Sequence, residues 1–344
     1  MGFRKIRVGE LSESILERVR AESQDVTFID VGARGGVTGL SRIAKSVRAL
    51  GIEPNPNEKF LIESNHYAQD PRGFWTTPNY KKLDYFWGAI APSQQTHTKL
   101  YVTQHPGASG VYQPNQSALN FKYKINMPHK ITSSNGFGDL FETVQEIQVP
   151  TLRLKDLMLK FDMDHIDYLK IDVEGFEAEV LESLEENLTN VTLIKVEVCF
   201  LPFRKNQKMF DTVFKNLTES GFEFLIFDGI QKGYKSNFSS KYWNAKHGFK
   251  DVHATWMSAD AFFWKIPEAP NHKLRGSVVL LHEGFIDQAV QCLASDKFFR
   301  VEDTSILKYW GIKNSVYTLL KFFLSRYKSL SFVIRWYNYL RSVK

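Results

Sequence analysis

Short apolar runs alternate with amphipathic stretches along most of this chain. The apolar runs predict strands over residues 27–31, over a short segment that ends at Glu53, and over 83–91, 167–174, 191–198, 222–227 and 259–265. Between them, apolar residues recur at helical spacing in 10–22, 40–47, 152–161, 180–188 and 209–217. Strands and helices in alternation are typical of an α/β sheet. The pattern therefore predicts an N-terminal helix within residues 1–25 and an α/β domain over 26–266.

The helical pattern is lost between about residues 99 and 150. Pro, Gly, Asn, Gln and Ser dominate there, as in HPGASGVYQPNQS, yet Tyr112, Phe121 and Tyr123 recur among them. Aromatic residues in such a stretch favour a folded insert of hairpins and loops over a linker, and long loops on a domain often carry function. We expect this insert to cover a binding pocket, or else to be an ordinary surface hairpin.

One predicted strand carries charges that packing does not explain. In DYLKIDVEGFE, residues 167–177, the side chains of Lys170, Asp172 and Glu174 share one face of the strand. Charged groups inside an apolar strand cost free energy unless they are paired or lie at a site. These three lie towards the carboxyl end of the strand, where open α/β sheets bind their ligands. The stretch therefore predicts an active site.

A glycine loop, DVGARGG (residues 30–36), follows the first strand of the domain. Glycine lets the backbone approach a ligand closely. The spacing does not fit the dinucleotide pattern GxGxxG, and the carboxylate of Asp30 suits a sulfonium and ammonium ligand better than a phosphate. Glu53, about twenty residues further on, suits hydrogen bonds to ribose hydroxyls. Together these features favour S-adenosylmethionine over NAD, and the alternative is a structural turn with a surface glutamate.

With these segments in order, the chain resembles the FkbM family of S-adenosylmethionine-dependent methyltransferases. The matching segments are FIDVGARGG, GIEPNPN, VPTLRLKDL, IDYLKIDVEGFEAEVL, VEVCFLPF and ADAFF, which span about residues 26–266. The family often has Asn at the position of Arg34. The resemblance implies a class I methyltransferase fold, a Rossmann-like and mostly parallel sheet of seven strands with one antiparallel strand and helices on both faces. We expect a helical extension over residues 267–344 to follow it.

The resemblance implies O-methylation of a hydroxyl on a sugar, a glycan or a related natural product. The predicted cofactor-binding residues are Asp30, Gly32, Ala33, Arg34, Gly36, Glu53 and Asn55. A protein that has kept the fold but lost the chemistry, and acts as a binding or scaffold protein, is the alternative. An NAD-dependent enzyme is disfavoured by the spacing of the glycine loop.

An alcohol must lose its proton as the new C–O bond forms, which requires a general base. Asp172 and Glu174 are the candidates. Lys170 either holds Asp172 ionised or is itself the base, with a pKa lowered by burial. Asp172, Glu174 and Glu197 could instead hold a divalent metal that binds the acceptor oxygen. The structural alternatives are capping of the next helix by the acids, and an ion pair of Lys170 with Asp172 or Asp167.

The nine histidines show no metal-ligand spacing. His165 is close to the predicted active site in the sequence, and we expect it to be a solvated loop residue.

The net charge of +6 is concentrated at the C-terminal end. Residues 304–344 contain eight basic and no acidic residues, and removing these from the total leaves residues 1–303 with a net charge of −2. A general nucleic-acid-binding function therefore loses most of its support. Over 315–344, apolar and aromatic residues form one helical stripe flanked by lysines and arginines. This stripe fits a helix in a membrane interface, or a helix packed on its own domain or on a dimer partner.

Two features bear on the compartment of the protein. Two cysteines, Cys199 and Cys292, are too few for a disulfide framework, which favours a reducing compartment. The N-terminal residues lack the apolar core of a signal peptide, and no run of about 18 apolar residues occurs. We therefore expect a cytoplasmic protein, peripheral at a membrane surface if the basic tail binds lipid.

Overall fold

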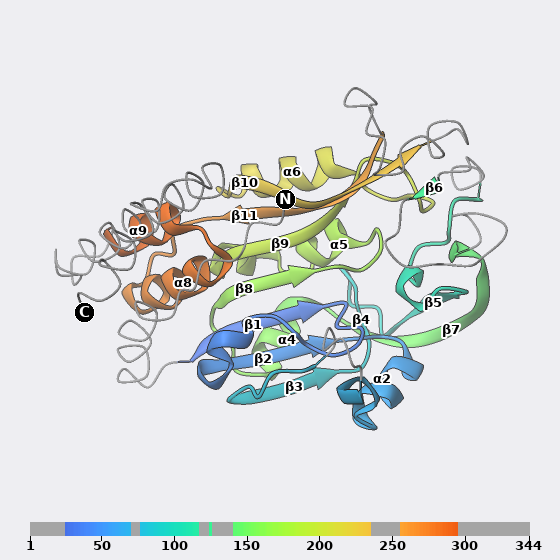
Figure 1. Ribbon diagram of the computed structural model, residues 1–344, viewed down its shortest axis with the longest axis horizontal. Coiled ribbons are helices and arrows are strands. Elements are labelled where there is room, and N and C mark those ends of the chain that lie inside the picture. Colours follow the sequence, from blue (N-terminus) through green and yellow to red (C-terminus); the bar gives the residue numbers. More distant parts are fainter. Residues whose placement is uncertain (1–24, 70–75, 117–123, 126–139, 235–254, 295–344) are drawn as a thin grey trace, which may run out of the picture.

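The computed structural model describes residues 25–69, 76–116, 124–125, 140–234 and 255–294 (Figure 1). The predicted N-terminal helix, the basic tail over 304–344, Phe121 and Tyr123 lie outside these residues.

A single large sheet forms the centre of the molecule (Figure 1). Its strands lie in the order β3 (Lys82–Phe86), β2 (Val47–Ile52), β1 (Val26–Val31), β8 (Ile166–Ile171), β9 (Val191–Cys199), β11 (Thr255–Trp264), β10 (Glu223–Tyr234) and β6 (Lys124–Ile125). The pairs from β3 to β9 are parallel, and β11 is antiparallel to both β9 and β10. Seven strands with one antiparallel strand confirm the predicted class I methyltransferase fold, to which the two-residue β6 adds an edge.

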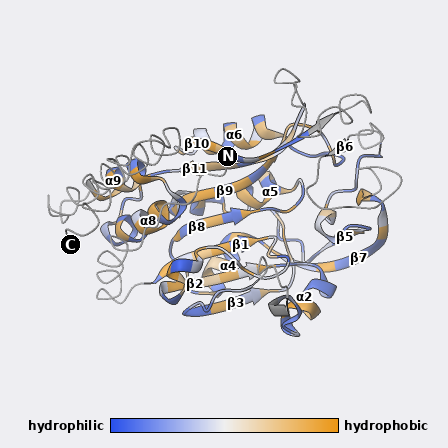
Figure 2. Cartoon of the chain, in the orientation of Figure 1, coloured by the Kyte–Doolittle hydropathy of each residue, from blue (hydrophilic) through white to orange (hydrophobic). Residues whose placement is uncertain are grey.

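Helices cover both faces of the sheet. On one face, α8 (Pro270–Glu283), α9 (Ile286–Ala294) and the 3-10 helix η1 (Ser41–Ser46) pack against one core cluster. On the other face lie α4 (Leu154–Lys160), α5 (Glu177–Glu182) and α6 (Phe210–Glu219). Figure 2 shows that these helices carry both hydrophobic and hydrophilic residues, whereas much of β9 is hydrophobic. A central strand that is buried on both faces consists mostly of apolar residues. The apolar run over 191–198 therefore predicted β9.

The core cluster on the face covered by α8 includes residues beyond 266, the predicted end of the α/β domain. The buried Leu274 and Val278 of α8 belong to the same cluster as Val26 of β1 and Tyr168 of β8. Helix α8 therefore serves as a covering layer of the sheet. No helix in the described part of the chain is long and apolar enough to cross a membrane. Both Cys199 and Cys292 are buried.

The two ends of the predicted insert, residues 99–150, belong to a second, smaller sheet. Strands β5 (His97–Thr103) and β7 (Thr143–Leu152) pair antiparallel, and β4 (Ala89–Ile90) pairs in parallel with β7. The 3-10 helix η3 (Pro106–Ala108) follows β5. Figure 1 shows this sheet beside the carboxyl ends of β8 and β9.

Three predicted elements have different bounds. The helix expected over 40–47 is the short η1, because Val47 already pairs with Val26 as the first residue of β2. The strand expected over 83–91 is split into β3 and β4 at Gly88, where an added Cβ would lie 2.5 Å from the carbonyl oxygen of Pro150. The strand expected over 167–174 ends at Ile171, so Asp172 and Glu174 lie in a loop.

The expectation that His165 is solvated is wrong. Its side chain is buried below α8, where its ring stacks on that of His272 at a centroid distance of 4.0 Å, and its Nε2 lies 2.8 Å from the Thr192 hydroxyl. Burial, with the nearby charges of His272 and Arg275, lowers the pKa of His165 to about 2. Asp167 lies in the same region, where its carboxylate pairs with Nε of Arg275 at 3.1 Å. It is therefore not the partner of Lys170.

Candidate active site

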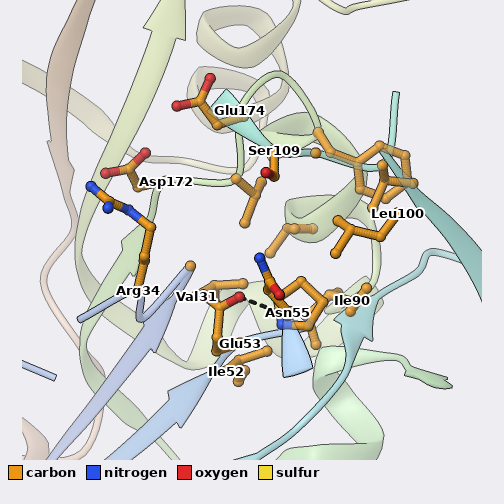
Figure 3. Close-up of a pocket in the computed structure, with 18 of the residues that line it drawn as sticks. Val31, Arg34, Ile52, Glu53, Asn55, Ile90, Leu100, Ser109, Asp172 and Glu174 are labelled. Carbon is orange, nitrogen blue, oxygen red and sulfur yellow. Dashed lines mark hydrogen bonds between the residues drawn. The ribbon is translucent and has the colours of Figure 1, made fainter. Parts of the chain in front are cut away.

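A pocket opens where the carboxyl ends of β1, β2, β8 and β9 meet the insert (Figure 3). Residues from all of these elements line it, including Gly32, Glu53, Asp172, Glu197 and Ser109. The strand order explains this meeting, because β2, β1, β8 and β9 are successive neighbours in the sheet. Side chains that follow these strands are thereby brought to one edge.

The glycine loop joins two of the strand ends by direct backbone contact. The amide of Gly32 donates to the carbonyl of Ile52 at 2.9 Å, and the amide of Asp172 donates to the carbonyl of Val31 at 2.9 Å. Gly32 has φ of +88°, and a Cβ added to it would lie only 1.9 Å from the carbonyl oxygen of Asp172. This position therefore admits only glycine.

Glu53 forms the far end of the pocket, at the end of β2. Its Oε1 accepts a hydrogen bond from the amide of Asn55 at 2.8 Å (Figure 3). The side chain of Asn55 in turn accepts from the amide of Asn57 at 3.0 Å and caps α2 (Pro56–Glu63), where Pro56 occupies the first turn. Burial raises the pKa of Glu53 to about 8, against the opposing hydrogen bond from Asn55. Apolar side chains of Ile52, Ile90 and Leu100 lie around this end.

Three carboxylates lie at the other end of the pocket. Oxygen atoms of Asp172, Glu174 and Glu197 all lie within 4.8 Å of one another. Burial, followed by the charges of Asp172 and Glu174, raises the pKa of Glu197 well above its ordinary value. Burial also raises the pKa of Glu174 to about 7, although the charge of Arg204 opposes this effect. Such a group of oxygens attracts cations.

The loop that presents two of these carboxylates has an unusual backbone. Glu174 has φ of +61°, in the left-handed region that non-glycine residues seldom adopt, and Gly175 follows with φ of +100°. Oε1 of Glu177, the first residue of α5, accepts from the amides of Val173 at 3.2 Å and Gly175 at 2.9 Å. The turn is thus held from below by Glu177, and Asp172 and Glu174 do not cap the helix.

Lys170 is paired across the sheet with Asp30. Its Nζ lies 3.0 Å from Oδ1 of Asp30 and 3.9 Å from Oδ2 of Asp172. Burial acts to lower the pKa of Lys170, but the charges of Asp30 and Asp172 and the hydrogen bond to Asp30 outweigh it, so the pKa lies above its ordinary value. Lys170 therefore stays protonated, and the alternative in which burial makes it a base has no support in this geometry.

Arg34 adds a positive charge to the lining of the pocket. Its side chain lies beside Asp172 in Figure 3, and its positive charge acts to lower the pKa values of both Glu53 and Glu174. The insert supplies the opposite wall, through Pro106, Gly107, Ser109, Gly110 and Val111. The pocket is thus lined by both the sheet edge and the insert.

Most of the predicted site residues meet in this pocket. Those that line it are Gly32, Arg34, Glu53, Asn55, Lys170, Asp172, Glu174 and Glu197. Asp30, Ala33 and Gly36 lie close by in the same loop but do not line it; Asp30 is 1% exposed, and its carboxylate faces Lys170. Contact of these three with a cofactor stays a prediction.

Sequence reasoning missed Glu58, Glu177 and Arg204. Glu58 lines the pocket from α2, and the other two hold the loop that carries Glu174. The one available signal was for Arg204, a charged residue directly after the apolar run CFLPF.

Comparison with known proteins identifies the family. A family model described as "Methyltransferase FkbM domain" matches residues 30–224. The chain belongs to the FkbM methyltransferase family. The matched range includes the glycine loop, Glu53 and the loop after β8. This FkbM protein is therefore a methyltransferase by family, and its sheet has the S-adenosylmethionine-dependent methyltransferase fold.

Individual relatives are distant. Methyltransferase 1 of Beauveria bassiana (strain ARSEF 2860) is 30% identical over 88 residues, which are 25% of this chain and 35% of that protein. The match spans about a third of the length of that relative. Among solved structures, the chain is similar to magnesium protoporphyrin IX methyltransferase (ChlM) from Synechocystis PCC 6803 with bound SAM, with 11% identity, coverage of 76% of this chain and 82% of that chain, and a TM-score of 0.31. It is also similar to StiE O-MT residues 961–1257, with 8% identity, coverage of 81% and 80%, and a TM-score of 0.29.

The pocket of this FkbM protein fits S-adenosylmethionine in its donor set. Glu53 offers a buried carboxylate for a ribose diol, and Ile52, Ile90 and Leu100 offer apolar surface for an adenine ring. Gly32 lines the pocket between its two ends without a side chain of its own.

Proposed function

We propose that this protein is an S-adenosylmethionine-dependent O-methyltransferase that acts on a hydroxyl of a sugar, a glycan or a related natural product. The observation that carries the proposal is the placement of Asp172 in the same pocket as Gly32 and Glu53. A cofactor bound through Glu53 and the glycine loop would have a carboxylate beside its far end. Methylation at oxygen needs such a base, because the attacking hydroxyl must lose its proton.

In this mechanism the cofactor supplies the methyl group and the protein supplies position and a proton acceptor. Methyl transfer is an in-line displacement, so much of the rate comes from holding the acceptor oxygen in line with the transferred group. Asp172 accepts the proton of the hydroxyl. Its side chain is 43% exposed and Lys170 Nζ lies 3.9 Å away, so it faces the pocket with a fixed positive charge behind it.

The polar groups at the acceptor end suit a compound with several hydroxyls. Glu197, the Gln231 amide and the Ser109 hydroxyl line the pocket together with Asp172 and Glu174. Carboxylates, amides and hydroxyls can donate to or accept from neighbouring sugar hydroxyls. The insert would then cover the acceptor, as its sequence led us to expect.

A divalent metal at the carboxylate cluster is a variant of the same function. Asp172, Glu174 and Glu197 would hold it, since oxygen atoms of all three lie within 4.8 Å of one another. Hard divalent cations prefer carboxylate ligands, and a metal there would lower the pKa of an acceptor hydroxyl bound to it. Loss of transfer after dialysis against a chelator, restored by magnesium, supports this variant. Full activity in the chelator restricts the role of Asp172 to that of a base.

The function is tested by incubating the protein with methyl-labelled S-adenosylmethionine and a glycan or lipid extract, followed by mass spectrometry of the labelled product. A product that carries one methyl on a hydroxyl oxygen is expected. Calorimetry with S-adenosylmethionine and with NAD separates the alternatives. Binding of S-adenosylmethionine without any transfer points to a scaffold, and binding of NAD alone contradicts the proposal.

A further inference from the structure

Arg204 is a fully buried arginine directly behind the acceptor end of the pocket. It follows β9 and is 1% exposed. Arginine is seldom buried to this extent unless it is paired. Its position in the segment 200–205 places it between the loop after β8 and the insert, two parts of the chain that meet at the pocket wall.

On one side, Arg204 holds the loop that presents Glu174. Its Nη2 lies 3.1 Å from Oε2 of Glu174. Its aliphatic stem packs under the same turn, because a Cβ added to Gly175 would lie 3.0 Å from Cγ of Arg204. The left-handed backbone of Glu174 is thus supported by a charge-assisted hydrogen bond at its side chain and by packing beneath it.

On the other side, Arg204 holds the insert. Nη2 also donates to the carbonyl oxygen of Ala108, and the guanidinium lies over the ring of Phe141, with Cζ 5.1 Å from the ring centroid. A Cβ added to Gly110 would lie 3.6 Å from Cζ. Ala108 and Gly110 flank Ser109, so the arginine fixes the stretch that forms the pocket wall.

The surrounding backbone strengthens this connection. The amide of Asn115 donates to the carbonyl of Phe203 at 2.8 Å, and the amide of Lys205 donates to the carbonyl of Gln113 at 2.9 Å. The segment around Arg204 and the insert thus lie against each other along several residues.

Burying the Arg204 guanidinium costs free energy, which indicates that the residue does not serve mainly to stabilise the fold. Among the described residues, its Nε and Nη1 are buried without a hydrogen-bond partner. Unpaired buried donors cost free energy, and apolar replacement of buried ion pairs is often neutral or stabilising. Another role has to explain the arginine.

We propose that Arg204 is a positioning residue, which holds the Glu174 carboxylate and the insert stretch 106–111 together as the acceptor-side wall of the pocket. The proposal rests on the proposed function, in which that end of the pocket takes the acceptor. Cofactor binding at the Glu53 end does not depend on Arg204, whereas methyl transfer does.

The test compares R204A, R204K and R204M with a control variant, K215M. Lys215 is an exposed residue of α6 that pairs with Glu219, and α6 does not line the pocket. Three quantities are measured: affinity for S-adenosylmethionine, hydrogen exchange of residues 106–115, and methyl incorporation into a glycan extract, with and without added guanidinium chloride at millimolar concentration.

We expect R204A and R204M to keep cofactor affinity within about twofold, to lose exchange protection at 106–115, and to lose about 10- to 100-fold in transfer rate, as for one charge-assisted hydrogen bond. Guanidinium restores part of the transfer by R204A and does not change that of K215M, and R204K lies between wild type and R204A. Unchanged protection and transfer in R204A overturns the proposal, as does a parallel loss of cofactor affinity. If the wild type itself transfers no methyl group, the proposed function fails, while exchange and cofactor affinity still decide the positioning role.

Discussion

Nζ of Lys170 lies 3.0 Å from Oδ1 of Asp30, across the boundary between β8 and β1. The two residues are registered neighbours in the parallel sheet, and the carboxylate of Asp30 is almost fully buried. The anomalous charge in the middle of β8 is therefore explained by a partner that lies 140 residues earlier in the chain. This pair places a protonated lysine at the pocket, and the proposed function accordingly assigns the proton-accepting role to a carboxylate, Asp172.

The first prediction concerns the stability of this pair. Removing Lys170 by K170M leaves a buried aspartate without its counter-charge, which costs about 3–5 kcal/mol of unfolding free energy. The double variant D30N/K170M recovers most of this loss. Urea denaturation measures both. If Lys170 were instead the base, K170M would retain its stability and lose methyl transfer alone.

The second prediction concerns Gly32 and uses Gly221 as its control. Both have positive φ, +88° and +85°, but a Cβ on Gly32 meets the carbonyl of Asp172 at 1.9 Å while one on Gly221 meets nothing within 4 Å. G221A should cost only the backbone strain, about 1 kcal/mol. G32A should separate β1 from the loop after β8 and abolish binding of S-adenosylmethionine. Calorimetry and thermal unfolding compare the two, and equal effects would show that the close approach at Gly32 has no role.

The third prediction is a proton released on cofactor binding. The pKa of Glu53 is about 8 because of burial, so this carboxyl is mostly protonated at pH 7. Ribose hydroxyls that donate to the carboxylate favour its ionised form, so binding at pH 7 should release roughly one proton. Calorimetry in phosphate and in Tris buffer measures it through the different heats of buffer ionisation. Equal heats in the two buffers would contradict the role of Glu53.

The same group makes stability depend on pH without cofactor. The pKa of Glu53 is raised from 4.5 to about 8 in the folded protein, so the unfolded chain ionises first as pH rises. Its contribution is therefore fully present below about pH 4.5 and is lost progressively between about pH 4.5 and 8. The difference in unfolding free energy between wild type and E53Q should change in this window and level off above it. A difference that is flat with pH would contradict the raised pKa.

The fourth prediction concerns the basic tail. We propose peripheral membrane contact through residues 315–344, because its apolar stripe is flanked by basic residues, each worth roughly 1 kcal/mol near an anionic surface. Flotation with liposomes that contain phosphatidylserine should recover the full chain, and recover less of it after removal of residues 305–344. Equal recovery in the soluble fraction would favour a tail that packs on protein.

The apolar pattern predicted the central strands well, and for a physical reason. Strands such as β9 are buried on both faces, so their apolar runs need no knowledge of their neighbours. The carboxyl-end rule likewise brought Glu53 and Asp172 to one edge, because it depends only on parallel strands. The position of the Arg34 side chain and the close backbone contact at Gly32 could not be predicted in this way, because both depend on how the neighbouring strands are placed.

Other features depended on contacts far away in the sequence. His165 lies in a polar stretch and was expected in solvent, but α8, over 100 residues later, buries it against His272. Arg204 meets Glu174 across 30 residues of chain and Ala108 across 96. No local periodicity encodes such meetings. The helix expected over 40–47 is only the short 3-10 helix η1, because Val47 pairs with Val26 in the sheet although its position fits the helical spacing.

The central claim is that cofactor and acceptor chemistry occupy opposite ends of one pocket, with Glu53 at one and Asp172 at the other. It is tested most directly by measuring cofactor affinity and methyl transfer in D172N and in E53Q, with D84N on β3 as a surface control. We predict that D172N binds S-adenosylmethionine as the wild type does and transfers methyl about 10²- to 10⁴-fold more slowly, the usual contribution of a general base. E53Q should lose affinity for the cofactor. Undiminished transfer by D172N would contradict the account.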